Sequence, residues 1–60
     1  MTITELQQKL ATLNARLAAC EKRLKKKGIS PEDFDAECFI FDHLSDLVRS
    51  TEVALEEASK

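Results

Sequence analysis

The stretch LKKKGISPEDF, from Leu24 to Phe34, contains the only glycine and the only proline of the chain. Gly28 suits the left-handed position that ends many helices, because a β-carbon costs energy in that conformation. Ser30 is a good N-cap, and Pro31 fits the first position of a helix, where a missing N–H does no harm. The stretch therefore predicts a turn over residues 28–30, where one helix stops and another starts at once.

Apolar residues before this turn recur at alternating intervals of three and four, the spacing of a heptad seam. They are Ile3, Leu6, Leu10, Leu13, Leu17, Cys20 and Leu24. Thr2 and Glu5 fit a capping box, in which each side chain accepts a hydrogen bond from the other residue's backbone N–H. We expect a helix over about residues 3–27, with lysines 25–27 in its last turn, where the helix dipole favours cations.

A second helix is expected over about residues 31–58, and its apolar residues cover roughly half of the circumference, more than one neighbouring helix needs. Glu37 and Thr51 interrupt its seam. The first helix also carries a stripe of small residues, namely Ala11, Ala15, Ala18 and Ala19. Both features predict that residues 1–60 form a single all-α domain, an antiparallel two-helix hairpin that dimerises into a four-helix bundle.

The core and dimer interface of this bundle follow from the two seams. We expect them to contain Leu10, Leu13, Leu17, Cys20, Ile40, Phe41, Leu44, Leu47 and Val48. In a hairpin folded at residues 28–30, residues that face each other have numbers that sum to about 59. Lys22 should then face Glu37, and Lys26 should face Asp33.

Charge is divided between the two segments. Residues 1–27 carry seven Lys/Arg and two Glu, whereas residues 28–60 carry two Lys/Arg and nine Asp/Glu. One interpretation is that a basic helix pairs with an acidic one. The other is that Lys22, Arg23, Lys25 and Lys26 form a surface for nucleic acid.

Composition and motifs argue against several classes of protein. Two cysteines do not make a disulfide framework, the N-terminus lacks the pattern of a signal peptide, and no apolar run reaches the ~20 residues of a membrane helix. The chain has no glycine-rich phosphate loop, CxxC or HExxH motif. His43, Asp46 and Ser50 share a helix face, but a flat face offers neither a pocket nor an oxyanion hole. We expect a cytoplasmic protein without enzymatic activity, cofactor, metal, small-molecule substrate or membrane partner.

Phe39 is the residue that the predicted core does not explain. It falls on the side of the second helix away from the seam, near His43 and Asp46. A single exposed phenylalanine is ordinary, and a dimer could also cover it. Alternatively, Phe39 anchors a protein partner, since aromatic residues are enriched at binding hot spots.

The second helix contains DHLSDLVRS, residues 42–50, preceded by Cys38. Asp42-His43, Leu47 and Arg49-Ser50 resemble the second helix of the Rop family, plasmid-encoded RNA-binding hairpins that dimerise into four-helix bundles. Cys38 also corresponds if one residue is shifted, and total length and layout agree. The resemblance implies the bundle and, for function, the binding of RNA. In Rop-like proteins an aromatic residue on the first helix contacts RNA, whereas the first helix here has none, so no contact residue is transferred.

Two functions remain open from the sequence. The first is a homodimeric hairpin that binds and regulates a protein through Phe39, His43 and Asp46, similar in style to short accessory proteins of temperate phages and plasmids. The second is a Rop-like RNA-binding regulator that uses Lys22, Arg23, Lys25 and Lys26. RNA binding should weaken steeply with added salt, and protein binding should depend on Phe39.

Overall fold

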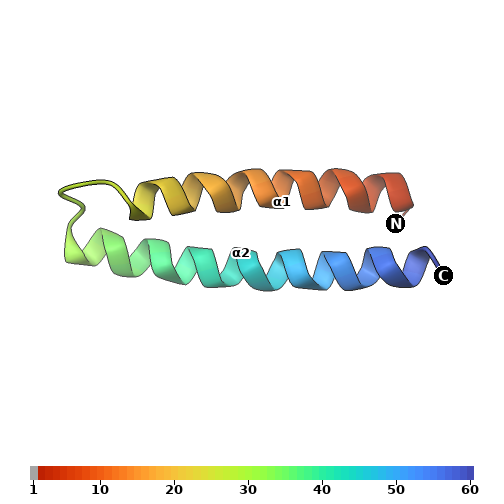
Figure 1. The fold of residues 1–60 in the computed structure, drawn as a ribbon. Coiled ribbons are helices and arrows are strands. Elements are labelled where there is room, and N and C mark those ends of the chain that lie inside the picture. The colour runs from red at the N-terminus through yellow and green to blue at the C-terminus, as the bar shows by residue number, and fades with distance from the viewer. Residues whose placement is uncertain (1) are drawn as a thin grey trace.

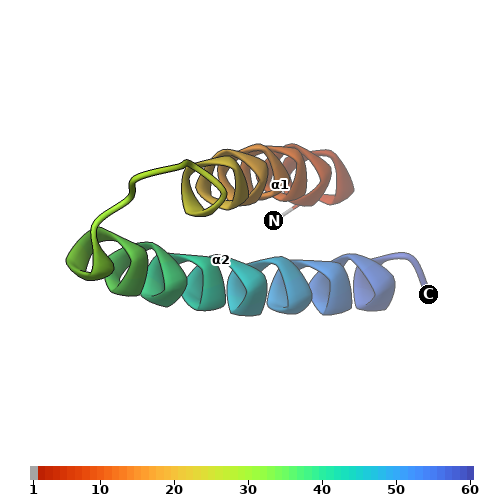
Figure 2. The same ribbon diagram turned by 60° about the vertical axis from the view of Figure 1, so that its left-hand side comes forward.

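The computed structural model describes residues 2–60 and consists of two α-helices, α1 (Ile3–Leu24) and α2 (Pro31–Ala58) (Figure 1). The helices lie side by side and antiparallel, which confirms the predicted all-α hairpin. The Cα trace measures 46 × 14 × 13 Å, with the turn at one end and the start of α1 and the end of α2 at the other (Figures 1 and 2). Met1, the first residue of the predicted domain, lies outside the described residues.

Both helices begin where the sequence predicts, and their capping side chains explain why. The Thr2 backbone N–H donates to Glu5 Oε1 at 3.0 Å, and the Glu5 N–H donates to Thr2 Oγ1 at 3.1 Å. At α2, the Ser30 hydroxyl accepts from the Asp33 N–H at 3.1 Å, and Pro31 occupies the first turn. These bonds satisfy N–H groups that have no partner within the helix.

The end of α1 differs from the prediction, because the helix stops at Leu24 and not at residue 27. The Lys26 N–H bonds to the Arg23 carbonyl at 3.2 Å, so the chain tightens as it leaves the helix. Leu24 is the last residue of α1 that packs on the core, whereas residues 25–27 are exposed. Without packing, a further helical turn has little to stabilise it. The three lysines therefore belong to the connection between the helices.

Gly28 has a φ of +80°, the only positive φ among residues 2–60. Replacing Gly28 with alanine should destabilise the chain by about 1 kcal/mol or more, because a β-carbon is strained in the left-handed region. A β-carbon built there meets no atom within 4 Å, so the cost comes from the backbone and not from a clash. Urea unfolding measures the effect, with Lys27→Ala, at an exposed neighbour, as the control. Equal stabilities of the two variants would contradict the left-handed turn.

The core of the hairpin is a narrow line of residues between the helices. Four apolar residues of the described part of the chain are buried, namely Leu6, Leu13, Cys20 and Leu44. Leu17, Leu24, Phe41, Leu47 and Val48 are partly buried against this core. Of the other residues expected in the core or dimer interface, Leu10 is half-buried, and Ile40 is 41% exposed, so one hairpin does not bury it.

Thr51 is buried, although the sequence suggested a polar interruption of the seam. Its hydroxyl donates to the Leu47 carbonyl at 2.8 Å, one turn earlier in the same helix. A buried hydroxyl is tolerated when it has such a partner. The seam therefore continues through Thr51 towards the free end of the hairpin.

Neither α1 nor α2 is both long and apolar enough to cross a membrane.

Candidate functional site

Phe39 lies on the outer side of α2 and is 78% exposed. Of the five large apolar residues that are exposed among residues 2–60, it is the most exposed, ahead of Val53 at 53%. Burying a phenylalanine is worth roughly 1.5–3 kcal/mol, and the single hairpin gains little of this from Phe39. The residue therefore offers apolar area to another molecule.

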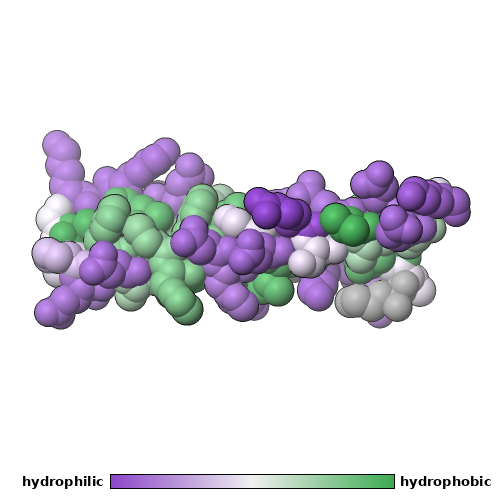
Figure 3. Space-filling model, turned by 90° about the horizontal axis from the view of Figure 1, so that it is seen from below, coloured by the Kyte–Doolittle hydropathy of each residue, from purple (hydrophilic) through white to green (hydrophobic). Residues whose placement is uncertain are grey.

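His43 and Asp46 share the helix face of Phe39, and Val53 continues it. The spacings from Phe39 are four, seven and fourteen residues, which place these side chains along one side of a helix. All four residues are exposed. We refer to Phe39, His43, Asp46 and Val53 as the outer face. Figure 3 views the hairpin from the α2 side and shows apolar side chains gathered over its half next to the turn.

The predicted basic residues cluster around the end of α1. Lys22, Arg23, Lys25 and Lys26 are all exposed. Lys25 Nζ, just after the end of α1, lies 3.8 Å from Oε1 of Glu21 in that helix. Of these four residues, Arg23 alone makes an ion pair with α2 among the described residues, with Nε 2.8 Å from Glu37 Oε1.

The two predicted facing ion pairs are therefore wrong in detail. Glu37 pairs with Arg23 and not with Lys22, because Arg23 follows buried Cys20 by three residues and so lies near the same part of α2. No ion pair joins Lys26 to Asp33 within residues 2–60. The early end of α1 explains this, since Lys26 lies in the connection and outside the helical register.

A polar cluster of Cys20, Glu37 and Arg23 joins the helices near the turn. The Cys20 Sγ is 3.0 Å from Glu37 Oε2 and 3.2 Å from the Glu37 carbonyl oxygen, and the thiol is fully buried. Arg23 Nε donates to the other carboxylate oxygen of Glu37 at 2.8 Å. The Glu37 side chain is only 17% exposed, so its two partners satisfy a charge that is largely withdrawn from water. Glu37 thus links α2 to α1 at two points.

Burial raises the pKa of the Cys20 thiol, and the hydrogen bond to Glu37 and its negative charge raise it further. The same hydrogen bond lowers the pKa of the Glu37 carboxyl, as does the bond from Arg23. At neutral pH the cluster thus holds a protonated thiol, a carboxylate and a guanidinium. Nucleophilic cysteines need an accessible thiolate, which this thiol does not provide. The arrangement favours a structural role for Cys20.

Glu37→Gln should reduce the loss of stability that the chain suffers in acid. The pKa of Glu37 is lowered in the folded state, so its stabilising effect is present above the unfolded pKa and is lost as the pH falls through the folded pKa. This loss begins as the pH falls below the ordinary carboxyl value of 4.5. Urea midpoints measured across the acid range for the wild type and the variant test the prediction.

Glu5 provides a matched control for this experiment. Its pKa is also lowered, by hydrogen bonds from the Thr2 backbone and side chain, so Glu5→Gln should remove a separate part of the acid dependence. Of the wild type, the two single variants and the double variant, the double variant should lose the least stability in acid. Identical acid profiles for the wild type and Glu37→Gln would show that the cluster is not formed in solution.

No other arrangement in the described part of the chain suggests a catalytic or metal site. A shallow hollow beside the turn has a volume of about 310 Å³. Arg23 and Lys26 line it together with Asp33 and Glu37, so its charges balance and select no ligand of one sign. Within residues 2–60, no three His, Cys, Asp or Glu side chains are grouped so that they could hold a metal ion.

Comparisons of the chain with protein-family models, curated proteins and solved structures found no match. Function must therefore be inferred from the surfaces of the hairpin. Sequence reasoning located the exposed Phe39 but missed the Cys20–Glu37 contact. A signal for this contact was present, since Glu37 interrupts an apolar seam at nearly the level of Cys20.

Proposed function

We propose that the chain is a small non-enzymatic regulatory protein of the cytoplasm, which binds another protein as a homodimeric helical hairpin. Exposed Phe39 on the outer face of α2 is the observation that carries this proposal. An aromatic residue on a regular helix offers apolar area at low entropic cost, and such residues dominate binding hot spots. We further propose that it is encoded by a phage or plasmid, because its length and hairpin layout are similar in style to short accessory proteins of temperate phages.

The surface area of the hairpin supports the homodimer. A compact monomer of 6.8 kDa should expose about 4,000 Å², whereas this chain exposes 4671 Å². A standard interface buries about 800 Å² on each partner, so the excess is close to what one interface removes. Two hairpins packed as a four-helix bundle would bury flanks that a single hairpin leaves half-exposed.

Phe39→Ala should weaken binding to the partner by about 2 kcal/mol or more, roughly 30-fold in affinity. The tagged wild type would first capture its partner from a nuclease-treated cell lysate, and the affinity of each variant for the purified partner would then be measured. Val53→Ala, further along the same face, is the matched control and should change affinity less. Undiminished affinity of a folded Phe39→Ala protein would contradict the proposed anchor.

An RNA-binding regulator of the Rop type is the second candidate. The exposure of Lys22, Lys25 and Lys26 around the turn supports it, since none of them pairs with α2 among the described residues. RNA binding would then fall steeply with salt, and replacing two of these lysines would lower the slope of log affinity against log salt by about 2. If nuclease treatment abolishes the capture of the partner and Phe39→Ala does not, the result would favour RNA binding over protein binding.

A further inference from the structure

One side of the hairpin carries a continuous apolar flank to which both helices contribute. On α1, Leu10 and Leu17 lie three residues before and four after buried Leu13. On α2, Phe41 and Val48 have the same relation to buried Leu44. Because the helices are antiparallel, positions with the same relation to the seam fall on the same side of the hairpin. All four flanking residues are half-buried.

This common flank extends along most of the hairpin. Ile3 continues it at the free end and Phe34 near the turn, and these residues are 42% and 44% exposed. Half-buried Cys38 lies between Phe34 and Phe41. On the opposite side, α1 presents Lys9, Arg16 and Arg23, so that side is apolar on α2 alone. Within residues 2–60, the common flank is the one outer surface to which both helices contribute large apolar side chains.

A second copy of this chain is the occupant that the exposed area of the hairpin favours. The hairpin exposes about 700 Å² more than a compact monomer of its mass, close to the ~800 Å² that one partner buries in a standard interface. A face that packs on a second copy of itself must be apolar near its centre, and it must be complementary to itself after a two-fold rotation. The flank meets this demand with Leu10, Leu17, Phe41 and Val48.

Charge decides between the two ways of stacking the flanks. If the two turns lie at opposite ends of the dimer, α1 stacks on α1 and α2 stacks on α2. The two α2 helices, which belong to the acidic segment with its nine acids and two bases, then lie next to each other. If the turns lie at the same end, each α1 stacks on the α2 of the other copy, and basic and acidic segments alternate around the bundle. Like charges held close together destabilise an interface, and complementary ones favour it.

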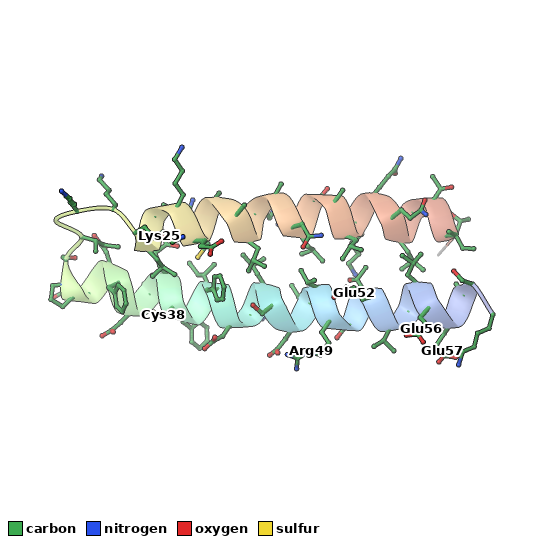
Figure 4. The ribbon with its side chains drawn as sticks, in the orientation of Figure 1. Lys25, Cys38, Arg49, Glu52, Glu56 and Glu57 are labelled. Carbon is green, nitrogen blue, oxygen red and sulfur yellow. The ribbon has the colours of Figure 1, made fainter. Side chains whose placement is uncertain are left out.

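Glu52, on the edge of the flank, points to the same arrangement. In Figure 4 it lies towards the free end of α2, whereas Cys38 lies near the turn. With α2 stacked on α2, its carboxylate would meet the apolar level of Cys38, at a desolvation cost. With the turns at one end, Glu52 lies instead at the level of Gln7, whose amide can donate a hydrogen bond.

We propose that two copies pair through the common flank with both turns at the same end, so that α1 of each copy packs against α2 of the other. This inference rests on the proposed homodimer and adds its interface and topology. Asn14 lies on the flank between Leu10 and Leu17, and Ser45 lies between Phe41 and Val48. Cys20 and Glu37 contact each other across the hairpin, and their numbers sum to 57. Asn14 and Ser45, whose numbers sum to 59, therefore lie within about 3 Å of the same level along the helix axes. Asn14 of one copy then faces Ser45 of the other near the centre of the interface.

Cysteines placed at these two positions test the topology. Asn14→Cys and Ser45→Cys are each made with Cys38→Ser, while Cys20 is kept because it is fully buried. The two proteins are mixed, unfolded and refolded together, oxidised, and separated without reductant. A disulfide needs Cα atoms within about 7 Å, which facing helices can reach and diagonal helices cannot. We expect the mixture to give a heterodimer of twice the 6.8 kDa monomer mass, and each protein alone to stay uncrosslinked.

The other outcomes separate the topology from the dimer itself. Crosslinking of Asn14→Cys alone, or of Ser45→Cys alone, would overturn the proposal in favour of turns at opposite ends. If the protein sediments as a dimer but the mixture gives no crosslinked product, the result would overturn the common flank as the dimer interface. A folded monomer in sedimentation of the wild type would instead overturn the homodimer, on which the inference rests, and would leave Phe39 as a partner anchor untouched.

Discussion

Replacing Leu44 with alanine should remove most of the stability of the chain against urea. Leu44 is one of only four apolar residues that are buried within residues 2–60, and it lies in the cluster with Leu13 and Cys20. Such a truncation in a core costs about 3–5 kcal/mol. A chain of 60 residues has a total stability of about 3–9 kcal/mol, so this loss removes most of it. Far-ultraviolet circular dichroism and urea unfolding measure the result.

Val53→Ala is the control for this experiment, because it also shortens an apolar side chain of α2. Val53 is 53% exposed, and a substitution at such a site changes stability by about 0.5 kcal/mol or less. The α2 helix of the control should therefore persist when that of Leu44→Ala is lost. A Leu44→Ala protein with a nearly native urea midpoint would mean that the two helices pack through another seam.

The helical hairpin could be predicted because each of its local signals acts over a few residues. Thr2 and Ser30 cap the helices through bonds to N–H groups three residues away, and Gly28 alone adopts a positive φ within residues 2–60. The two heptad seams then require antiparallel packing across a short connection. None of these inferences depends on where distant side chains meet.

The errors arose where tertiary contacts decide the outcome. Residues 25–27 have good helix propensity and favourable charge, yet they have nothing to pack on, so α1 stops at Leu24. Heptad spacing makes Glu37 an interruption of the seam, but in the structure Cys20 and Arg23 satisfy its carboxylate across the interface. Such a contact depends on the angle and rotation of both helices, which heptad spacing does not specify.

Phe41→Ala and Phe39→Ala should have very different effects, although the two residues are two positions apart on the same helix. Phe41 is partly buried against the core cluster, and we expect its truncation to cost about 3 kcal/mol, at the lower end of the range for core phenylalanines. Phe39 is 78% exposed, and its truncation should cost about 0.5 kcal/mol or less. Urea unfolding of both variants at one protein concentration gives the comparison.

The comparison also tests whether Phe39 contributes to folding or to recognition. A strongly destabilised Phe39→Ala protein would show that a second copy covers this ring, and any loss of partner binding would then follow from unfolding. Because dimer stability depends on protomer concentration, repeating the measurement at two concentrations separates the dimer contacts of Phe41 from its contacts within the hairpin. Phe41 lies on the common flank, so the stability lost in Phe41→Ala should include dimer contacts as well as contacts within the hairpin.

The cluster of Cys20, Glu37 and Arg23 also has a consequence for the order of events in folding. Cys20 and Glu37 are 17 residues apart in the chain, whereas contacts at the free end close a loop roughly three times longer, which costs about 1 kcal/mol more in chain entropy. Contacts beside the turn are therefore the least costly to form first, and the helices can then zip towards the termini. Local contacts of this kind are typical of chains that fold within microseconds to milliseconds. The cluster thus lies where a folding nucleus costs the least entropy, and the same loop lengths leave the free end as the first part of the hairpin to open.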